Sequence, residues 1–122
     1  MGGQPSNVHH SLFQGPKLIP DPGNAGTITT TEDLQICEMV SAKAETRTLA
    51  NPSKPGIRLI VRLLTDGGTV TVTAAAGFNV LLETEATFAD AGDFLSLISV
   101  TLVANSTYRW EIMEGNVGVT IA

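Results

Sequence analysis

The chain has 122 residues, a net charge of −5 at neutral pH, 43% hydrophobic residues and 16% charged residues. This length and composition predict a single folded domain, and its core must be largely aliphatic because aromatic residues make up only 5% of the chain. The acidic balance and the scattered Lys and Arg residues argue against direct binding of nucleic acid, and no stretch approaches the roughly 18 apolar residues of a membrane span.

The beginning of the chain is rich in proline and glycine. Residues 15–30, GPKLIPDPGNAGTITT, contain three of the six prolines and three of the twelve glycines. Because proline lacks a backbone donor and fixes φ, this leader is expected to form neither a helix nor an inner strand. We therefore expect an extended N-terminal arm over residues 1–26 and a β domain over residues 27–122. A disordered tail is the alternative.

From residue 27 onward the hydrophobic pattern has a period of two, which is typical of strands. Residues 57–64 alternate, and Asp66–Gly68 predict a tight hairpin that leads into the strand 69–73. A second hairpin is expected at Asn105–Thr107. One helical turn is the alternative within residues 30–45. Further strands are expected at 27–31, 34–40, 44–50, 79–84, 86–90, 94–104, 108–113 and 117–122. The predicted fold class is all-β: a compact antiparallel sandwich or barrel of about eight strands.

One face of the strand at residues 57–64 mixes charged and aliphatic side chains. Its members are Arg58, Ile60, Arg62 and Leu64. One interpretation is a solvated face on which the arginines lie over their apolar neighbours. The other is a subunit interface, where arginine is favoured.

The sequence offers few groups for catalysis or metal binding. His9 and His10 are adjacent in the leader, and adjacent side chains of an extended chain point apart, so we expect no metal there. Cys37 is the only cysteine and is interpreted as a small buried hydrophobe. We therefore predict that the chain is not an enzyme and has no cofactor.

Four carboxylates lie close together in sequence around a predicted turn. Oxygen ligands suit calcium, but the segment lacks the spacing of a calcium-binding loop. We interpret the group as turn chemistry, in which aspartates accept backbone hydrogen bonds, and as solvation. The four residues are Glu83, Glu85, Asp90 and Asp93.

Three segments together resemble a known family. They are IPDPGNAGTI at 19–28, AETRTLANPSKPG at 44–56, and TFADAGDFLSLISV with YRWEIMEGNVGVTIA at 87–100 and 108–122. In this order they resemble capsid decoration, or cement, proteins of tailed bacteriophages, over roughly residues 18–122. The resemblance implies a structural virion protein, commonly a homotrimer, that clamps neighbouring major capsid proteins. It would be made in the host cytoplasm and act on the outer capsid surface. It implies no catalytic residue.

This resemblance gives the leader an expected role as a capsid-binding arm, while the solvated face and the subunit interface both remain open for the arginine-bearing face. The expected arm contacts are Leu12, Phe13, Leu18, Ile19, Pro20 and Pro22. The alternative function is a tail- or fibre-associated β domain that binds a host receptor or polysaccharide. That function favours exposed aromatic side chains on loops, whereas Trp110 lies in an alternating strand and is expected in the core.

Overall fold

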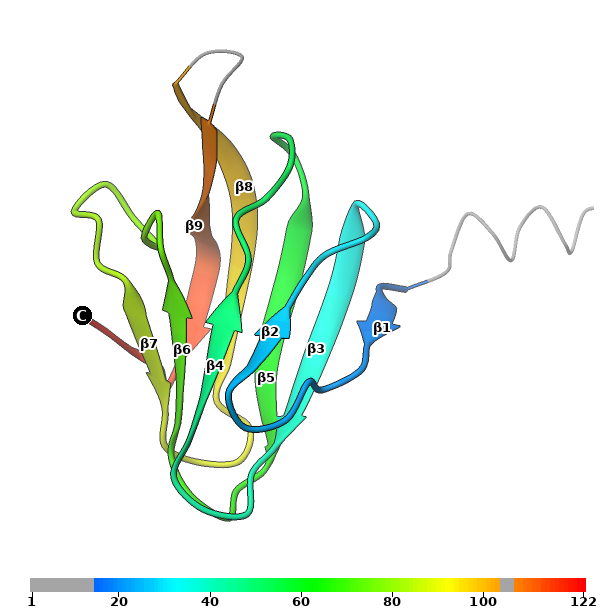
Figure 1. Cartoon of the computed structure of the whole chain (residues 1–122), viewed down its shortest axis with the longest axis vertical. Coiled ribbons are helices and arrows are strands. Elements are labelled where there is room, and N and C mark those ends of the chain that lie inside the picture. The colour runs from blue at the N-terminus through cyan, green and yellow to red at the C-terminus, as the bar shows by residue number, and fades with distance from the viewer. Residues whose placement is uncertain (1–14, 104–106) are drawn as a thin grey trace, which may run out of the picture.

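The computed structural model describes residues 15–103 and 107–122, and these form two five-stranded sheets that face each other (Figure 1). Sheet A consists, in spatial order, of β1 (Lys17–Ile19), β3 (Leu34–Val40), β5 (Arg58–Thr65), β8 (Phe94–Val103) and β9 (Thr107–Val117). Sheet B consists of β10 (Thr120–Ile121), β7 (Glu85–Phe88), β6 (Val70–Ala74), β4 (Glu45–Leu49) and β2 (Gly26–Ile28). The described residues include no helix.

The all-β sandwich is confirmed, but the sheets are mixed and do not close into a barrel. The first six strands alternate between the sheets, so β1, β3 and β5 run parallel in sheet A, and β2, β4 and β6 run parallel in sheet B. Two successive crossings return the chain to the same sheet in the same direction, which produces parallel neighbours. Antiparallel pairing begins with β7, β8, β9 and β10.

The predicted hairpin at Asp66–Gly68 is wrong. β5 pairs with β3 and β8, whereas β6 pairs with β4 and β7, so this turn carries the chain from one sheet to the other. The two glycines are needed for a close approach: a Cβ on Gly67 would overlap the Ser41 carbonyl oxygen, and a Cβ on Gly68 would overlap the backbone of Lys43.

Other local expectations have mixed outcomes. The second hairpin is confirmed by the antiparallel pairing of β8 with β9, whose connection at 104–106 lies outside the described residues. The helical turn within 30–45 is wrong, since β3 occupies 34–40. The strand expected at 79–84 is also wrong, because this segment is a loop between β6 and β7. The last short strand, β10, lies at an edge of sheet B.

The core lies between the sheets and is built from the alternate, inward-facing residues of each strand. Trp110 on β9 is 1% exposed, as expected, and its indole Nε1 donates a hydrogen bond to the Ala50 carbonyl at 2.9 Å. Phe78 and Phe88 are fully buried. Cys37 on β3 is also buried, which confirms its interpretation as a small core residue.

The two outward faces of the sandwich differ in chemistry. On sheet B, threonines stand in register across four neighbouring strands, at Thr46, Thr71, Thr87 and Thr120. Threonine suits a strand that meets water on one side. The outward face of sheet A instead carries mostly aliphatic and charged side chains. Aliphatic side chains are less usual than threonine on the solvent side of a sheet, so this face differs more from an ordinary solvent-facing surface.

Candidate functional site

The leader joins sheet A through β1, which pairs in parallel with β3. Leu18 points outward and is 62% exposed, while Ile19 is buried in the core, because successive residues of a strand face opposite sides. The leader therefore forms no inner strand, as expected, but contributes a short strand at the sheet edge, where proline-rich segments are tolerated. The Ile19 side chain is not available to an outside partner in this fold, contrary to its expected role in the arm.

The arm predicted over residues 1–26 is not confirmed as a unit. Pro20 is exposed and Pro22 is half-buried, so these two residues remain near the surface. Leu12 and Phe13 lie outside the described residues. Since β1 and the turn that follows it belong to the folded domain, only residues preceding β1 remain candidates for a free arm.

The turn between β1 and β2 is bound tightly to the neighbouring strand β4. The Ala25 amide donates to the Thr46 carbonyl at 2.7 Å, and the Thr46 amide donates to Asn24 Oδ1 at 3.0 Å. A Cβ on Gly26 would lie 2.6 Å from the Cβ of Pro22, so glycine is required for this packing. The turn that follows β1 is thus held in place by its contacts with the domain.

A buried ion pair adds to this attachment. The Arg47 side chain is fully buried, and it donates from Nε to Asp21 Oδ1 at 2.7 Å and from Nη2 to Asp21 Oδ2 at 3.0 Å. Its Nη1 lies 3.0 Å from Glu45 Oε1, and its Nη2 also donates to the Val40 carbonyl at 3.1 Å. A bidentate, charge-assisted pair of this kind fixes both partners in one geometry. It connects the leader directly to the inside of the sandwich.

The ionisation of Asp21 reflects the same contacts. Burial opposes the charged form, but hydrogen bonds from Arg47 and from the amides of Val40 and Gly23 outweigh it, so the Asp21 pKa lies below its usual value. The pKa of Arg47 is raised, chiefly by its hydrogen bond to Asp21. Both groups are therefore charged at neutral pH, and the pair persists there.

The outward face of sheet A contains the four residues expected at a subunit interface. Arg58 is exposed, Leu64 is 43% exposed, and Ile60 and Arg62 are half-buried. The expected alternation along β5 is therefore correct. Whether the face contacts another subunit stays a prediction.

The neighbouring strands extend this face by one apolar row that is flanked by charged residues. Register places Leu18, Ile36 and Ile60 side by side across β1, β3 and β5. Two residues further along β3 and β5, Arg62 Nη1 donates to Glu38 Oε2 at 3.0 Å. Aliphatic side chains with interspersed arginine are characteristic of protein interfaces.

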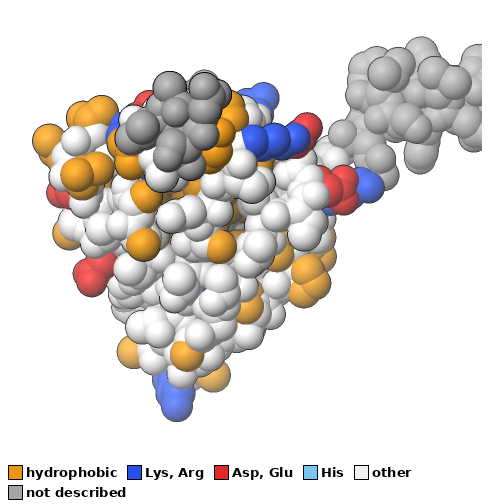
Figure 2. All heavy atoms as spheres, turned by 45° about the horizontal axis from the view of Figure 1, so that its top comes forward, with side chains coloured by type: hydrophobic (Ala, Val, Ile, Leu, Met, Phe, Trp, Pro, Cys, Tyr) orange, Lys and Arg blue, Asp and Glu red, His pale blue; other side chains and the backbone are white. Residues whose placement is uncertain are grey.

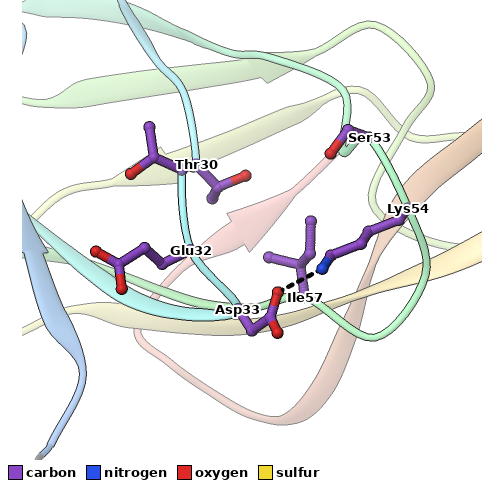
Figure 3. Close-up of a pocket in the computed structure, with 7 residues that line it drawn as sticks. Thr30, Glu32, Asp33, Ser53, Lys54 and Ile57 are labelled. Carbon is purple, nitrogen blue, oxygen red and sulfur yellow. Dashed lines mark ion pairs between the residues drawn. The ribbon is translucent and has the colours of Figure 1, made fainter.

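Two hollows lie among the loops at one end of the sandwich. The first has a volume of about 280 Å³ and lies between the loop after β2 and the loop before β5 (Figure 3). Lys54 Nζ and Asp33 Oδ1 meet at 2.8 Å beside it, and both side chains are more than half exposed, so this ion pair contributes little stability. The second, of about 240 Å³, is lined by Asn51, Pro52, Ser53, Thr107 and Tyr108.

A more distinctive feature at the same end is the β6–β7 loop, where three consecutive aliphatic residues face solvent. Val80, Leu81 and Leu82, which we call the apolar tip, are 75%, 74% and 57% exposed. Figure 2 shows apolar side chains gathered on this loop, at the upper left of the view. Sequence reasoning missed the tip because a run of aliphatic residues also predicts a strand. The signals that could have revealed it are Gly77 and Asn79, which favour a turn.

Comparison with known proteins places the chain in no family. No family model matches the sequence, and no curated protein matches it.

The carboxylates grouped around residue 90 fit the interpretation as turn chemistry. Asp93 Oδ2 accepts hydrogen bonds from the amides of Ala89 and Asp90 at 3.1 and 3.0 Å. Glu83 Oε1 accepts one from Asn79 Nδ2 at 2.8 Å. Within the described residues, no three His, Cys, Asp or Glu side chains come together as a metal site. That part of the chain also contains no helix able to span a membrane.

Proposed function

We propose that the chain is a structural virion protein that decorates the outer surface of a bacteriophage capsid. In this role its N-terminal segment grips a neighbouring major capsid protein. The observation that supports the proposal is the attachment of the leader to the domain. Ile19 lies in the core, and Asp21 is held by the buried Arg47.

A clamp must pass tension from the segment that grips its partner into a folded body. A leader joined through a flexible linker would stretch under load before it transmitted force. Here the β1 pairing with β3 and the Asp21–Arg47 ion pair hold the base of the leader on the domain. The exposed Leu18 and Pro20 flank this base and offer surface to the same neighbour.

The alternative receptor-binding function has less support. Sugar-binding surfaces present aromatic rings to solvent, but Phe78, Phe88 and Trp110 are buried. Phe94 and Tyr108, the other aromatic residues in the described part of the chain, are half-buried.

The test is a truncation that removes residues 1–14 and leaves every described strand intact. The full chain and the truncated chain are mixed with expanded shells, assembled from the major capsid protein encoded in the same genome, and sedimented. We expect the full chain to sediment with the shells and the truncated chain to remain in the supernatant. Both should give the same urea midpoint by Trp110 fluorescence. Removal of residues 1–26 would be uninformative, because it deletes β1 and Asp21.

A matched variant separates chemistry from length. Leu12→Ser combined with Phe13→Ser keeps the whole segment but removes the two adjacent apolar side chains nearest to β1 within it. Loss of sedimentation in this variant supports apolar anchoring. The proposal is wrong if the truncated chain decorates the shells as tightly as the full chain does.

A further inference from the structure

Hydrogen bonds hold the apolar tip at both ends of the loop. Asn79 Oδ1 accepts hydrogen bonds from the amides of Leu81 and Glu83 at 3.1 and 3.2 Å, and the Leu82 amide donates to the Asn79 carbonyl at 3.0 Å. Phe78 is fully buried beneath the loop, and its amide donates to the Glu83 carbonyl at 2.8 Å. These contacts fix the loop at both ends.

The backbone of the tip is also strained. Leu82 has a φ of 60°, in the left-handed region that side chains with a Cβ rarely adopt. Such strain persists only where the surrounding structure enforces it, and it is concentrated at binding and switch sites. A loop that is already ordered loses little conformational entropy when it docks. Three adjacent exposed aliphatic residues on such a loop indicate a binding site for another protein.

The same chain carries a complementary surface. The outward face of sheet A offers Ile36 and Ile60 side by side, followed on β8 by Ser96, and Ile98 lies two residues further along β8. Arg58 is exposed beside this strip, and register places it opposite Ile98. Glu111 lies on the other side of Ile98 but pairs with Arg109 at 2.7 Å, whereas Arg58 makes no ion pair within the described residues. The face is therefore apolar at its centre, with the Arg58 charge available near one end.

The charges beside the tip have the opposite sign. Glu83 adjoins Leu82, and the exposed Glu85 follows two residues later at the start of β7. Contact between the tips of two copies would bring these carboxylates together, which is unfavourable. Contact between a tip and the outward face of sheet A would instead bring Glu85 towards Arg58.

We propose that the apolar tip of one copy docks on the outward face of sheet A of a second copy. Val80 and Leu81 then cover Ile36 and Ile60. The two surfaces differ, so the contact is heterologous and repeats from copy to copy until a ring closes. Contacts between copies belong to the proposed decoration function, so the biological role of this assembly rests on that function. The experiments that test the contact do not depend on it.

The first experiment traps the contact by cross-linking. The variants Leu81→Cys and Ile60→Cys are purified separately, mixed, and oxidised under mild conditions. The native Cys37 is buried and does not compete. We expect a disulfide-linked dimer in the mixture, at about tenfold higher yield than in either variant alone. Thr48→Cys, on the exposed outward side of sheet B, replaces Ile60→Cys as the matched control and should give no such dimer with Leu81→Cys. Equal yields from Leu81→Cys alone, or no dimer in the mixture, would overturn the proposal.

The second experiment reverses charge. Glu85→Arg and Arg58→Glu should each weaken self-association about two- to fivefold, as exposed ion pairs do, and the double variant should restore it. Light scattering behind a sizing column measures association across a concentration series. If each single variant weakens self-association and the double variant does not restore it, the proposed pairing of Glu85 with Arg58 is wrong. Neither experiment uses a capsid. A negative result here would therefore contradict the contact between copies, and the proposed function would still be decided by the truncation experiment.

Discussion

The buried ion pair at the base of the leader makes a quantitative prediction for Asp21→Ala. The substitution removes two of the four close contacts of the Arg47 guanidinium, those at 2.7 and 3.0 Å. It also removes the acceptors for the Val40 and Gly23 amides, at 2.9 and 3.2 Å. Breaking a buried pair by removing one partner typically costs about 3–5 kcal/mol, because the other charge stays buried.

The lower end of this range is expected here. Glu45 still lies 3.0 Å from Arg47 Nη1, Nη2 still donates to the Val40 carbonyl, and the Asp21 side chain is 18% exposed, so the remaining charge keeps two partners and some access to water. We therefore expect a loss of about 3 kcal/mol in the free energy of unfolding. An unfolding entropy of about 2.1 cal/mol/K per residue gives about 0.26 kcal/mol/K for 122 residues, and hence a fall in Tm of about 12 °C.

Urea denaturation followed by the fluorescence of Trp110, the single tryptophan, measures this loss. Asp33→Ala is the matched control, because it removes the same side chain from the exposed Lys54 pair and should change stability by less than about 0.5 kcal/mol. A loss below about 1 kcal/mol for Asp21→Ala would refute the reasoning. It would mean that the Arg47 guanidinium finds water or another acceptor when Asp21 is absent.

Four further predictions concern the folded domain. The pKa of Asp21 is lower in the folded than in the unfolded state, so its charge stabilises the fold above about pH 4. This contribution is lost as the pH falls through the folded pKa. The stability difference between Asp21→Asn and the native chain should therefore shrink in acid. Burial raises the pKa of the Cys37 thiol to about 11, so a thiol reagent at pH 8 should modify it only in denaturant. Trp110→Ala should cost about 3–5 kcal/mol in chemical denaturation, and a loss under about 1 kcal/mol would be inconsistent with its burial. Gly118→Ala should lower stability by about 2 kcal/mol, because φ is +77° and the new Cβ would overlap the carboxylate of Asp93; an unchanged Tm would contradict this.

The alternation of the strands could be read from the sequence, but their partners could not. Along β3 and β5 the period of two correctly separates buried from outward residues. The turn at Asp66–Gly68 has the composition of a hairpin, yet it carries the chain between sheets. Its glycines satisfy a close approach to the backbone at Ser41 and Lys43. That approach is a tertiary contact, so no local pattern could distinguish it from hairpin chemistry.

The candidate site was likewise predictable only in part. The outward position of Arg58 and Ile60 follows from alternation alone, and so was predictable. The Asp21–Arg47 pair joins residues 26 positions apart, and nothing near either residue marks the other as its partner. The aliphatic run at Val80–Leu82 is typical of a strand, whereas the hydrogen bonds that Asn79 Oδ1 accepts from the amides of Leu81 and Glu83 make this segment a loop.

The positions of the leader and the tip connect the two proposals. β1 is the edge strand of sheet A on one side of the sandwich, and β7, which follows the tip, lies near the opposite edge of sheet B (Figure 1). In the two proposals, one copy would contact a capsid subunit through its leader and a second copy through its tip. In the two proposals each copy is held by its leader, by its own tip and by the sheet A face that accepts a neighbouring tip, so the assembly resists displacement more strongly than any single contact would.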